Sequence, residues 1–138
     1  MDKSMQQDRM RRWEDCLSPG PNCDCGRLKT SILEQLIQAA DISHTMQDWE
    51  IYQRWNRKLY KETTFAFQCE RGANDPSDFW HKGEFGFFDF VVIPLATRLA
   101  QHPVFAKAGQ EMLRNAKRNR EEWQRSGETA VMKYRYAQ

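Results

Sequence analysis

The sequence contains no apolar segment long enough to act as a signal core or to cross a membrane. Its most apolar stretch, FGFFDFVVIPLA, includes Asp89 and Pro94 and is shorter than the roughly 20 residues that a bilayer requires. Charged residues occur throughout the N-terminal stretch MDKSMQQDRMRRWED, where a signal peptide would need an apolar core. We therefore expect a soluble, intracellular and cytoplasmic chain with no direct membrane insertion.

The chain also lacks a predominance of charge of one sign. Its 21 basic and 19 acidic residues leave a net charge of +2, whereas domains that bind nucleic acid usually concentrate positive charge. We therefore expect no nucleic-acid partner. Hydrophobic residues make up 40% of the 138 positions, which is enough for one domain with its own core.

Cysteines in metal-binding pairs are missing as well. Three of the four cysteines, Cys16, Cys23 and Cys25, cluster in CLSPGPNCDCG, and the fourth is Cys69. A structural zinc site usually takes four ligands in paired spacings, which a C-x-C with one distant cysteine does not provide. Free thiols in a polar loop are the expected state of this cluster.

Strand-like alternation and internal repeats are absent, and helical periodicity is found in their place. A clear apolar stripe spans residues 28–40 and ends at Asp41. Asp48 is a suitable N-cap for the next helix, in which aromatic residues recur at three- and four-residue steps towards Phe67. Residues 1–17 fit a further helix, and residues 18–27 a loop. The predicted fold class is an all-α helical bundle.

The most apolar helix is expected to begin between residues 79 and 84 and to end near Leu99, with a kink at Pro94. Its apolar density from Phe85 to Ile93 predicts burial on all sides. A last helix is predicted over residues 107–126, with residues 124–138 as a tail. Because these helices offer limited cover for so apolar a segment, we expect the chain to be a portion of a larger compact helical domain.

Taken singly, the candidate functional residues have ordinary structural explanations. Asp41 alone is a helix-terminal carboxylate, and His44 alone is a partly exposed loop histidine. Glu84 alone is a first-turn acid that faces the helix dipole. The apolar and aromatic members would alone be core residues, and they are Tyr52, Trp55, Leu59 and Phe87.

Together these residues occur in an ordered pattern. The chain reads A-A-D-I-S-H, then W-x-x-Y-x-x-W-N-x-x-L-Y-x-E, then G-E-F-G-F-F-D-F-x-x-x-P-L, and finally N-R-E-E-W. From about Leu28 to Trp123, this order closely resembles the C-terminal part of the catalytic domain of the 3′,5′-cyclic nucleotide phosphodiesterases. The landmarks with matching spacing are Asp41, Trp55, Glu62, Gly86-Phe87 with Pro94, and Asn119-Arg120-Glu121.

The resemblance implies an all-helical enzyme that hydrolyses cyclic AMP or cyclic GMP at a binuclear site of zinc with magnesium or manganese. It implies that Asp41 is one metal ligand. It also implies that Phe87 stacks on the purine, and Glu84 stands where the family usually has a glutamine that hydrogen-bonds the base. The implied nucleotide-binding residues are His44, Tyr52, Trp55, Asn56, Leu59, Glu84 and Phe87.

Other residues that the resemblance requires are not found in the sequence. The family's metal site needs two histidines and another aspartate, in an H-N-x-x-H run and an H-D pair, and its general acid is a histidine. None of His44, His81 and His102 lies in such a run. We therefore expect residues 1–138 to be the C-terminal part of a catalytic domain, with no catalytic residue of its own and inactive without the missing N-terminal half. The alternative is a non-catalytic helical module of the same fold that binds a partner.

Overall fold

Helices joined by short connections form the described part of the chain. The computed structural model describes residues 7, 11 and 25–136, and none of these residues belongs to a β-strand. This confirms the predicted all-α class. The elements in chain order are α2 (Cys25–Asp41), the 3₁₀ helix η1 (Ser43–Met46), α3 (Trp49–Gln68), α4 (Pro76–Phe87), the π-helix η2 (Phe88–Val92), α5 (Ile93–Gln101) and α6 (Ala106–Tyr136).

Two predicted segments fall largely outside this part of the chain. The predicted helix over residues 1–17 is described only at residues 7 and 11, and residues 18–24 of the predicted loop are not described. Residues 25–27 belong to α2 and not to a loop. In this first turn the hydroxyl of Thr30 donates to the carbonyl of Gly26 at 3.0 Å, a contact between residues four apart.

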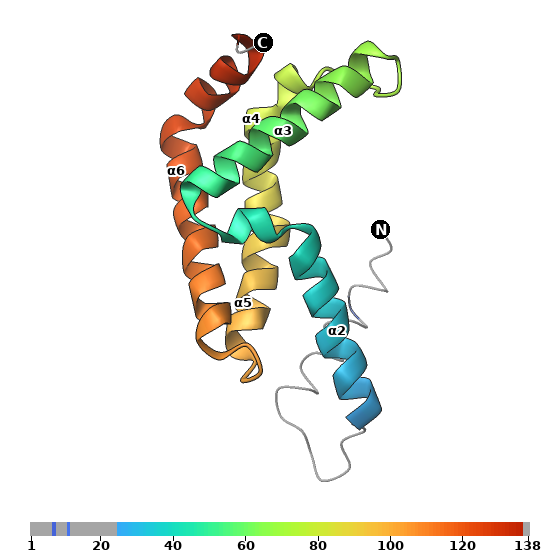
Figure 1. Ribbon diagram of the computed structural model, residues 1–138, viewed down its shortest axis with the longest axis vertical. Helices are drawn as coiled ribbons and strands as arrows, with labels where there is room; N and C mark the ends of the chain where they lie inside the picture. Colours follow the sequence, from blue (N-terminus) through green and yellow to red (C-terminus); the bar gives the residue numbers. More distant parts are fainter. Residues whose placement is uncertain (1–6, 8–10, 12–24, 137–138) are drawn as a thin grey trace.

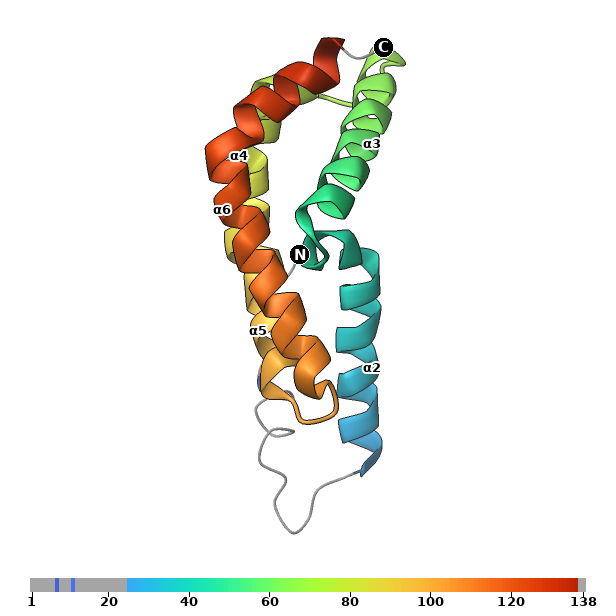
Figure 2. The same ribbon diagram turned by 60° about the vertical axis from the view of Figure 1, so that its left-hand side comes forward.

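The helices are arranged around one long rod. Figures 1 and 2 show that α4, η2 and α5 follow one another as this rod, and that α6 runs alongside it. The helix α3 packs against α4 and α6 at one end of the rod, and α2 packs against α5 at the other. The short η1 joins α2 to α3 near the middle of the molecule, where it contacts α6. Within the described residues, no helix is both long and apolar enough to cross a bilayer.

The starts of α3 and α4 are set by aspartate caps. The Asp48 side chain accepts a hydrogen bond of 3.1 Å from the amide of Ile51, as predicted for this N-cap. The helix α4 begins at Pro76, earlier than predicted, because Asp75 caps it by accepting from the amide of Ser77 at 2.8 Å. Proline suits the first helical turn, since the N–H that it lacks has no intrahelical partner there.

The predicted kink at Pro94 takes the form of a π-helical turn directly before it. The amide of Ile93 donates to the carbonyl of Phe88, five residues earlier. Pro94 has no N–H to donate, and its ring would collide with the carbonyl of Phe90 in a regular α-helix. The wider π-turn therefore lets the helix continue into α5.

The prediction that this Phe-rich segment is buried on all sides is wrong for the described chain. Phe88 and Val92 are fully buried, whereas the Phe90 side chain is 83% exposed. The reason is that α6 covers one side of the rod, and no other described element covers the side that holds Phe90 and Val91.

The helix α6 is longer than predicted and includes most of the segment predicted to be a tail. It continues to Tyr136 because Gly127, Ala130 and Tyr134 extend its buried face at three- and four-residue steps. Its start is fixed by a close approach to α5. A Cβ atom on Gly109 would lie 2.6 Å from the carbonyl oxygen of Leu99, so only glycine fits between the two backbones.

The helix α2 presents its predicted apolar stripe to solvent. Leu33 and Ile37 are 57% and 63% exposed, while Ser31 and Gln35 face the rest of the fold and are buried. The Gln35 side chain accepts a bond of 3.2 Å from Nε of Arg98 in α5. The bond from Arg98 to Gln35 and the buried Ala39, rather than Leu33 and Ile37, therefore attach α2 to the described chain.

Candidate functional site

The predicted metal ligand lies at the end of α2, where the chain turns. Asp41 is the last residue of α2 and is exposed. The following η1 has a buried Thr45, whose hydroxyl donates to the carbonyl of Ile42 at 2.6 Å. This local bond closes the tight turn that separates Asp41 from α3.

Two asparagines of α6 hold this turn in place. The fully buried Nδ2 of Asn119 donates to the carbonyl of Thr45 at 3.0 Å and to that of Gln47 at 2.7 Å. Nδ2 of Asn115, one turn earlier, donates to the carbonyl of Met46 at 3.2 Å. Since residues 45–47 have these partners in α6, the positions of Asp41 and His44 depend on a helix far away in the sequence.

The centre of the candidate site is a hydrogen bond between α3 and α4. The hydroxyl of Tyr52 donates to Oε2 of Glu84 at 2.6 Å. Burial raises the pKa of Tyr52 well above its usual value, and the negative charge of Glu84 raises it further. Burial also raises the pKa of Glu84, although the bond from Tyr52 acts in the opposite direction. Oε1 of Glu84 makes no hydrogen bond with any residue among 25–136.

The third member of this cluster is His44. Its ring is parallel to that of Tyr52 within 2°, with ring centroids 6.4 Å apart. The imidazole is half-buried, and burial lowers its pKa, which favours the neutral ring. The structure thus brings together three of the predicted site residues, His44, Tyr52 and Glu84.

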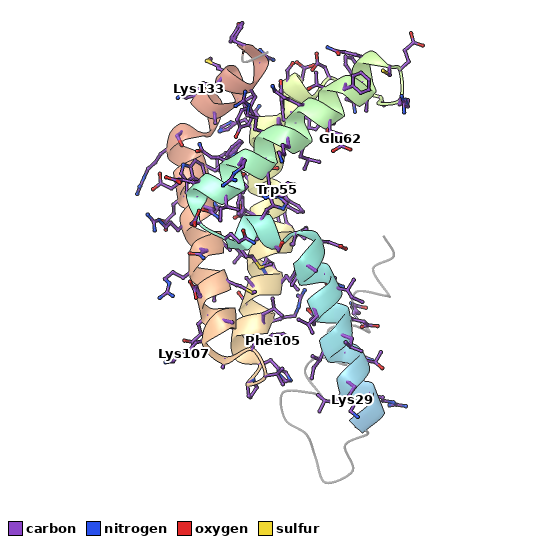
Figure 3. All side chains as sticks on the ribbon, viewed as in Figure 1. Lys29, Trp55, Glu62, Phe105, Lys107 and Lys133 are labelled. Carbon is purple, nitrogen blue, oxygen red and sulfur yellow. The ribbon has the colours of Figure 1, made fainter. Side chains whose placement is uncertain are left out.

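The predicted residues of α3 divide between two faces of the helix. Tyr52 and Asn56 are buried, and Oδ1 of Asn56 accepts a bond of 3.1 Å from Nε1 of Trp80. Trp55 and Leu59 lie on a more exposed face, where the Trp55 ring is 50% exposed and lies 4.5 Å from Nζ of Lys58. Figure 3 labels Trp55 on α3, near the middle of the molecule.

The remaining predicted residue, Phe87, is half-buried at the end of α4 and packs against the hydrophobic core. Beneath the Tyr52–Glu84 bond lie Phe88 and Trp123, whose rings meet Tyr52 edge-on at 5.4 and 5.9 Å. The floor of the site is therefore an aromatic cluster. Of the predicted site residues, His44, Glu84 and Phe87 are partly exposed, and Trp55 and Leu59 are exposed.

A second contact from α6 supports this end of α4. Arg120 binds Asp89 with two bonds, at 2.9 Å from Nε and 3.1 Å from Nη2, and its guanidinium lies 5.2 Å from the Phe85 ring. The hydrogen bond from Arg120 lowers the pKa of Asp89. Asn119 and Arg120 are landmarks of the family resemblance, and the sequence alone predicted no contact for either of them. The available signal was Asn119, a polar residue inside the buried stripe of α6.

Asp41 is a suitable donor for a hard divalent cation, but the described residues do not complete a ligand set around it. No group of three or more His, Cys, Asp or Glu side chains within residues 25–136 is placed to hold a metal ion. The predicted pair of zinc with magnesium or manganese would therefore need most of its ligands from elsewhere.

Comparison with known proteins gives a family for this arrangement. The family model described as 3'5'-cyclic nucleotide phosphodiesterase matches residues 3–116. A dual specificity calcium/calmodulin-dependent 3',5'-cyclic nucleotide phosphodiesterase 1B from Bos taurus is 31% identical over 78 residues, and so is the Mus musculus protein of that name. The match covers 48% of this chain and only 14% of each relative. No solved structure matches significantly.

Proposed function

Because the chain belongs to the 3′,5′-cyclic nucleotide phosphodiesterase family, we propose that it contributes the nucleotide pocket of an enzyme that hydrolyses cyclic nucleotides to 5′-monophosphates in signal transduction. In this proposal, residues 1–138 are the C-terminal part of the catalytic domain. The observation that supports it most is the cluster of His44, Tyr52 and Glu84, in which a half-buried carboxylate is held by a buried phenol.

We assign one metal ligand to this chain, the carboxylate of Asp41. A bound metal pair lowers the pKa of its water and neutralises charge on phosphoryl oxygens. The other ligands and the general acid would come from the N-terminal half of the catalytic domain, which is the partner that this chain requires. The chain alone is therefore expected to be inactive, since one protein ligand does not hold a metal pair.

The nucleotide would lie over the aromatic floor. Phe87 and Trp55 offer partly exposed rings for the purine, while Leu59 and His44 border them. Tyr52 and Asn56 would complete the pocket from beneath, Tyr52 through Glu84 and Asn56 through its bond to Trp80.

Glu84 would decide which base is preferred. An ionised carboxylate only accepts hydrogen bonds, and Oε2 already accepts one from Tyr52. Guanine presents N1–H and N2–H₂ as adjacent donors, whereas adenine presents one donor beside an acceptor nitrogen. A buried mismatch costs about 1–3 kcal/mol, so cyclic GMP is expected to be favoured over cyclic AMP by roughly ten- to a hundredfold in kcat/KM.

The test uses the full-length enzyme with both nucleotides. The ratio of kcat/KM values should favour cyclic GMP and should move towards cyclic AMP in Glu84→Gln, while the exposed Glu111→Gln leaves the ratio unchanged. Asp41→Asn should reduce both bound metal and activity, because an amide is a poorer ligand than a carboxylate. A wild-type preference for cyclic AMP that Glu84→Gln does not alter would mean that Glu84 does not contact the base.

The alternative is a non-catalytic module that uses the same fold to bind a partner. It is supported by the single ligand at Asp41 and by the exposed Leu33 and Ile37 on α2. A full-length protein that binds cyclic nucleotide but shows no metal-dependent hydrolysis with zinc and magnesium present would favour this alternative.

A further inference from the structure

A cavity of about 740 Å³ lies between α3 and the C-terminal part of α6. Its charged lining residues are Glu50, Arg54 and Arg57 from α3 and Lys133 from α6. We call this cavity the basic groove. Figure 3 labels Lys133 on α6 near the C-terminal end of the chain.

The basic groove is separate from the candidate nucleotide pocket. Successive residues of an α-helix are rotated by about 100°, so α3 presents two flanks beside its buried face of Tyr52 and Asn56. Arg57 lies on the flank that faces the basic groove. Trp55 and Leu59 lie on the opposite flank, as their position in the helical repeat requires. A ligand in one site would therefore not contact the other.

The floor of the groove is formed without any ligand. The hydroxyl of Tyr134 donates to the carbonyl of Gln53 at 3.4 Å, which joins α6 to α3. The Tyr134 ring also packs on Tyr60, with centroids 5.7 Å apart. Since these contacts hold the two walls together, the cavity exists before a ligand enters it.

The chemistry of the lining is that of an anion site. It has three cations against one carboxylate, and none of Arg54, Arg57 and Lys133 forms an ion pair with a carboxylate in the described part of the chain. The Thr129 hydroxyl adds an uncharged donor to the lining. The Tyr136 ring also lines the groove and is 83% exposed, so one face is available for stacking.

We propose that the basic groove binds a small phosphorylated anion, of which a nucleoside monophosphate is the best fit. Arginine forks match phosphate oxygens with paired bonds, and lysine adds a mobile point charge. The Tyr136 ring can stack on a planar base. The volume lies within the range of small-ligand sites. Glu50, as the one carboxylate, disfavours a ligand whose negative charge extends along the whole groove.

The experiment measures the binding of 5′-AMP and of inorganic phosphate to the full 138-residue chain by titration calorimetry. We expect saturable binding of 5′-AMP, with weaker binding of inorganic phosphate. The double variant Arg57→Ala, Lys133→Ala should weaken 5′-AMP binding about tenfold or more, because two charged contacts are lost. Tyr136→Ala should remove the advantage of 5′-AMP over inorganic phosphate.

Two controls separate this proposal from other causes. Arg114→Ala, Lys117→Ala removes two exposed cations of α6 outside the groove and should leave binding within about twofold. Trp55→Ala tests the candidate nucleotide pocket and should also have little effect. Circular dichroism checks that every variant keeps its helices. The proposal is wrong if the folded chain shows no saturable binding, if the Arg114, Lys117 variant weakens it equally, or if Trp55→Ala abolishes it.

Discussion

The side-chain amide of Asn119 lies 3.0 Å from the carbonyl oxygen of Thr45, although 74 positions separate the two residues. A second bond, to Gln47, uses the other hydrogen of the same amide. This one side chain therefore holds the connection between α2 and α3, on which the candidate metal ligand Asp41 and the candidate pocket residue His44 are carried.

The first prediction concerns that amide. In Asn119→Asp, an acceptor replaces the buried donor, and two carbonyls then face oxygen lone pairs. Loss of two buried hydrogen bonds should lower the free energy of unfolding by about 1–3 kcal/mol or more, measured as a reduced urea midpoint. Asn115→Asp is the matched control, since it is only half-buried and has one bond to Met46. Equal midpoints in the two variants would contradict the role given to Asn119.

The second prediction compares two glycines. A Cβ on Gly109 would meet the backbone of Leu99 at 2.6 and 2.8 Å, so Gly109→Ala must push α5 and α6 apart. We expect it to lower the thermal midpoint clearly, with a cost on the order of 1–3 kcal/mol. Gly83→Ala in α4 meets only the Phe79 ring at 3.7 Å and should raise stability by up to about 1 kcal/mol through helix propensity. Equal effects of the two substitutions would contradict the close approach.

The third prediction concerns the end of α3. Glu70 has φ of 57°, in the left-handed region. Its amide donates to the carbonyl of Phe67, and the amide of Arg71 donates to that of Ala66, which is the pattern of a Schellman motif. Glycine is the residue that fits this position best, so Glu70→Gly should stabilise the chain by up to about 1 kcal/mol. Glu70→Ala keeps the strain and should give no such gain in urea unfolding.

The fourth prediction concerns pH. Burial raises the pKa of Glu84 above its ordinary value of 4.5, so the folded chain keeps this proton to higher pH than the unfolded chain. Its stabilising contribution is present below 4.5 and is lost as the pH rises through the folded-state pKa. Glu84→Gln does not titrate and keeps an oxygen that accepts from Tyr52.

The measurement is the free energy of unfolding of wild type and Glu84→Gln at several pH values from 4 upward. The wild type should lose stability relative to the variant as the pH rises above about 4.5. The exposed Glu111→Gln should follow the wild type across the range. A difference between wild type and Glu84→Gln that does not change with pH would mean that burial does not shift this carboxyl group.

Local signals in the sequence predicted much of the fold. The cap at Asp48, the helix that follows it and the all-α class depend on neighbouring residues and were confirmed. The extent of α6 was missed because its buried face beyond Trp123 continues through small residues, Gly127 and Ala130, which give a weak hydropathy signal. The exposure of Phe90 was missed because composition does not tell which sides of a helix have neighbours.

The candidate site was harder to predict because it too depends on which helix faces have neighbours. The resemblance assigned Tyr52, Asn56, Trp55 and Leu59 to one nucleotide pocket, and this assignment stays a prediction. The structure adds that Tyr52 and Asn56 lie on a buried stripe of α3, whereas Trp55 and Leu59 lie on a more exposed one. Hydropathy would bury Leu59 before Asn56, whereas in the structure Asn56 is buried and accepts a bond from Trp80 in the next helix, α4. The Tyr52–Glu84 bond joins residues 32 positions apart, and no local sequence pattern predicts it.

The π-turn over residues 88–92 has a consequence for how this rod tolerates change. One additional residue in a turn shifts the phase of all later side chains by about 100° around the axis. The helical repeat that places Glu84 and Phe87 before the turn is therefore rotated relative to the repeat that places Leu95 and Leu99 after it. Deleting a single residue such as Phe90 would remove the additional residue of the π-turn while Pro94 remains, and only one half of the rod could then keep its orientation. An insertion or deletion in this short segment would rotate the side chains of α4 that belong to the candidate pocket relative to the side chains of α5 that contact α6.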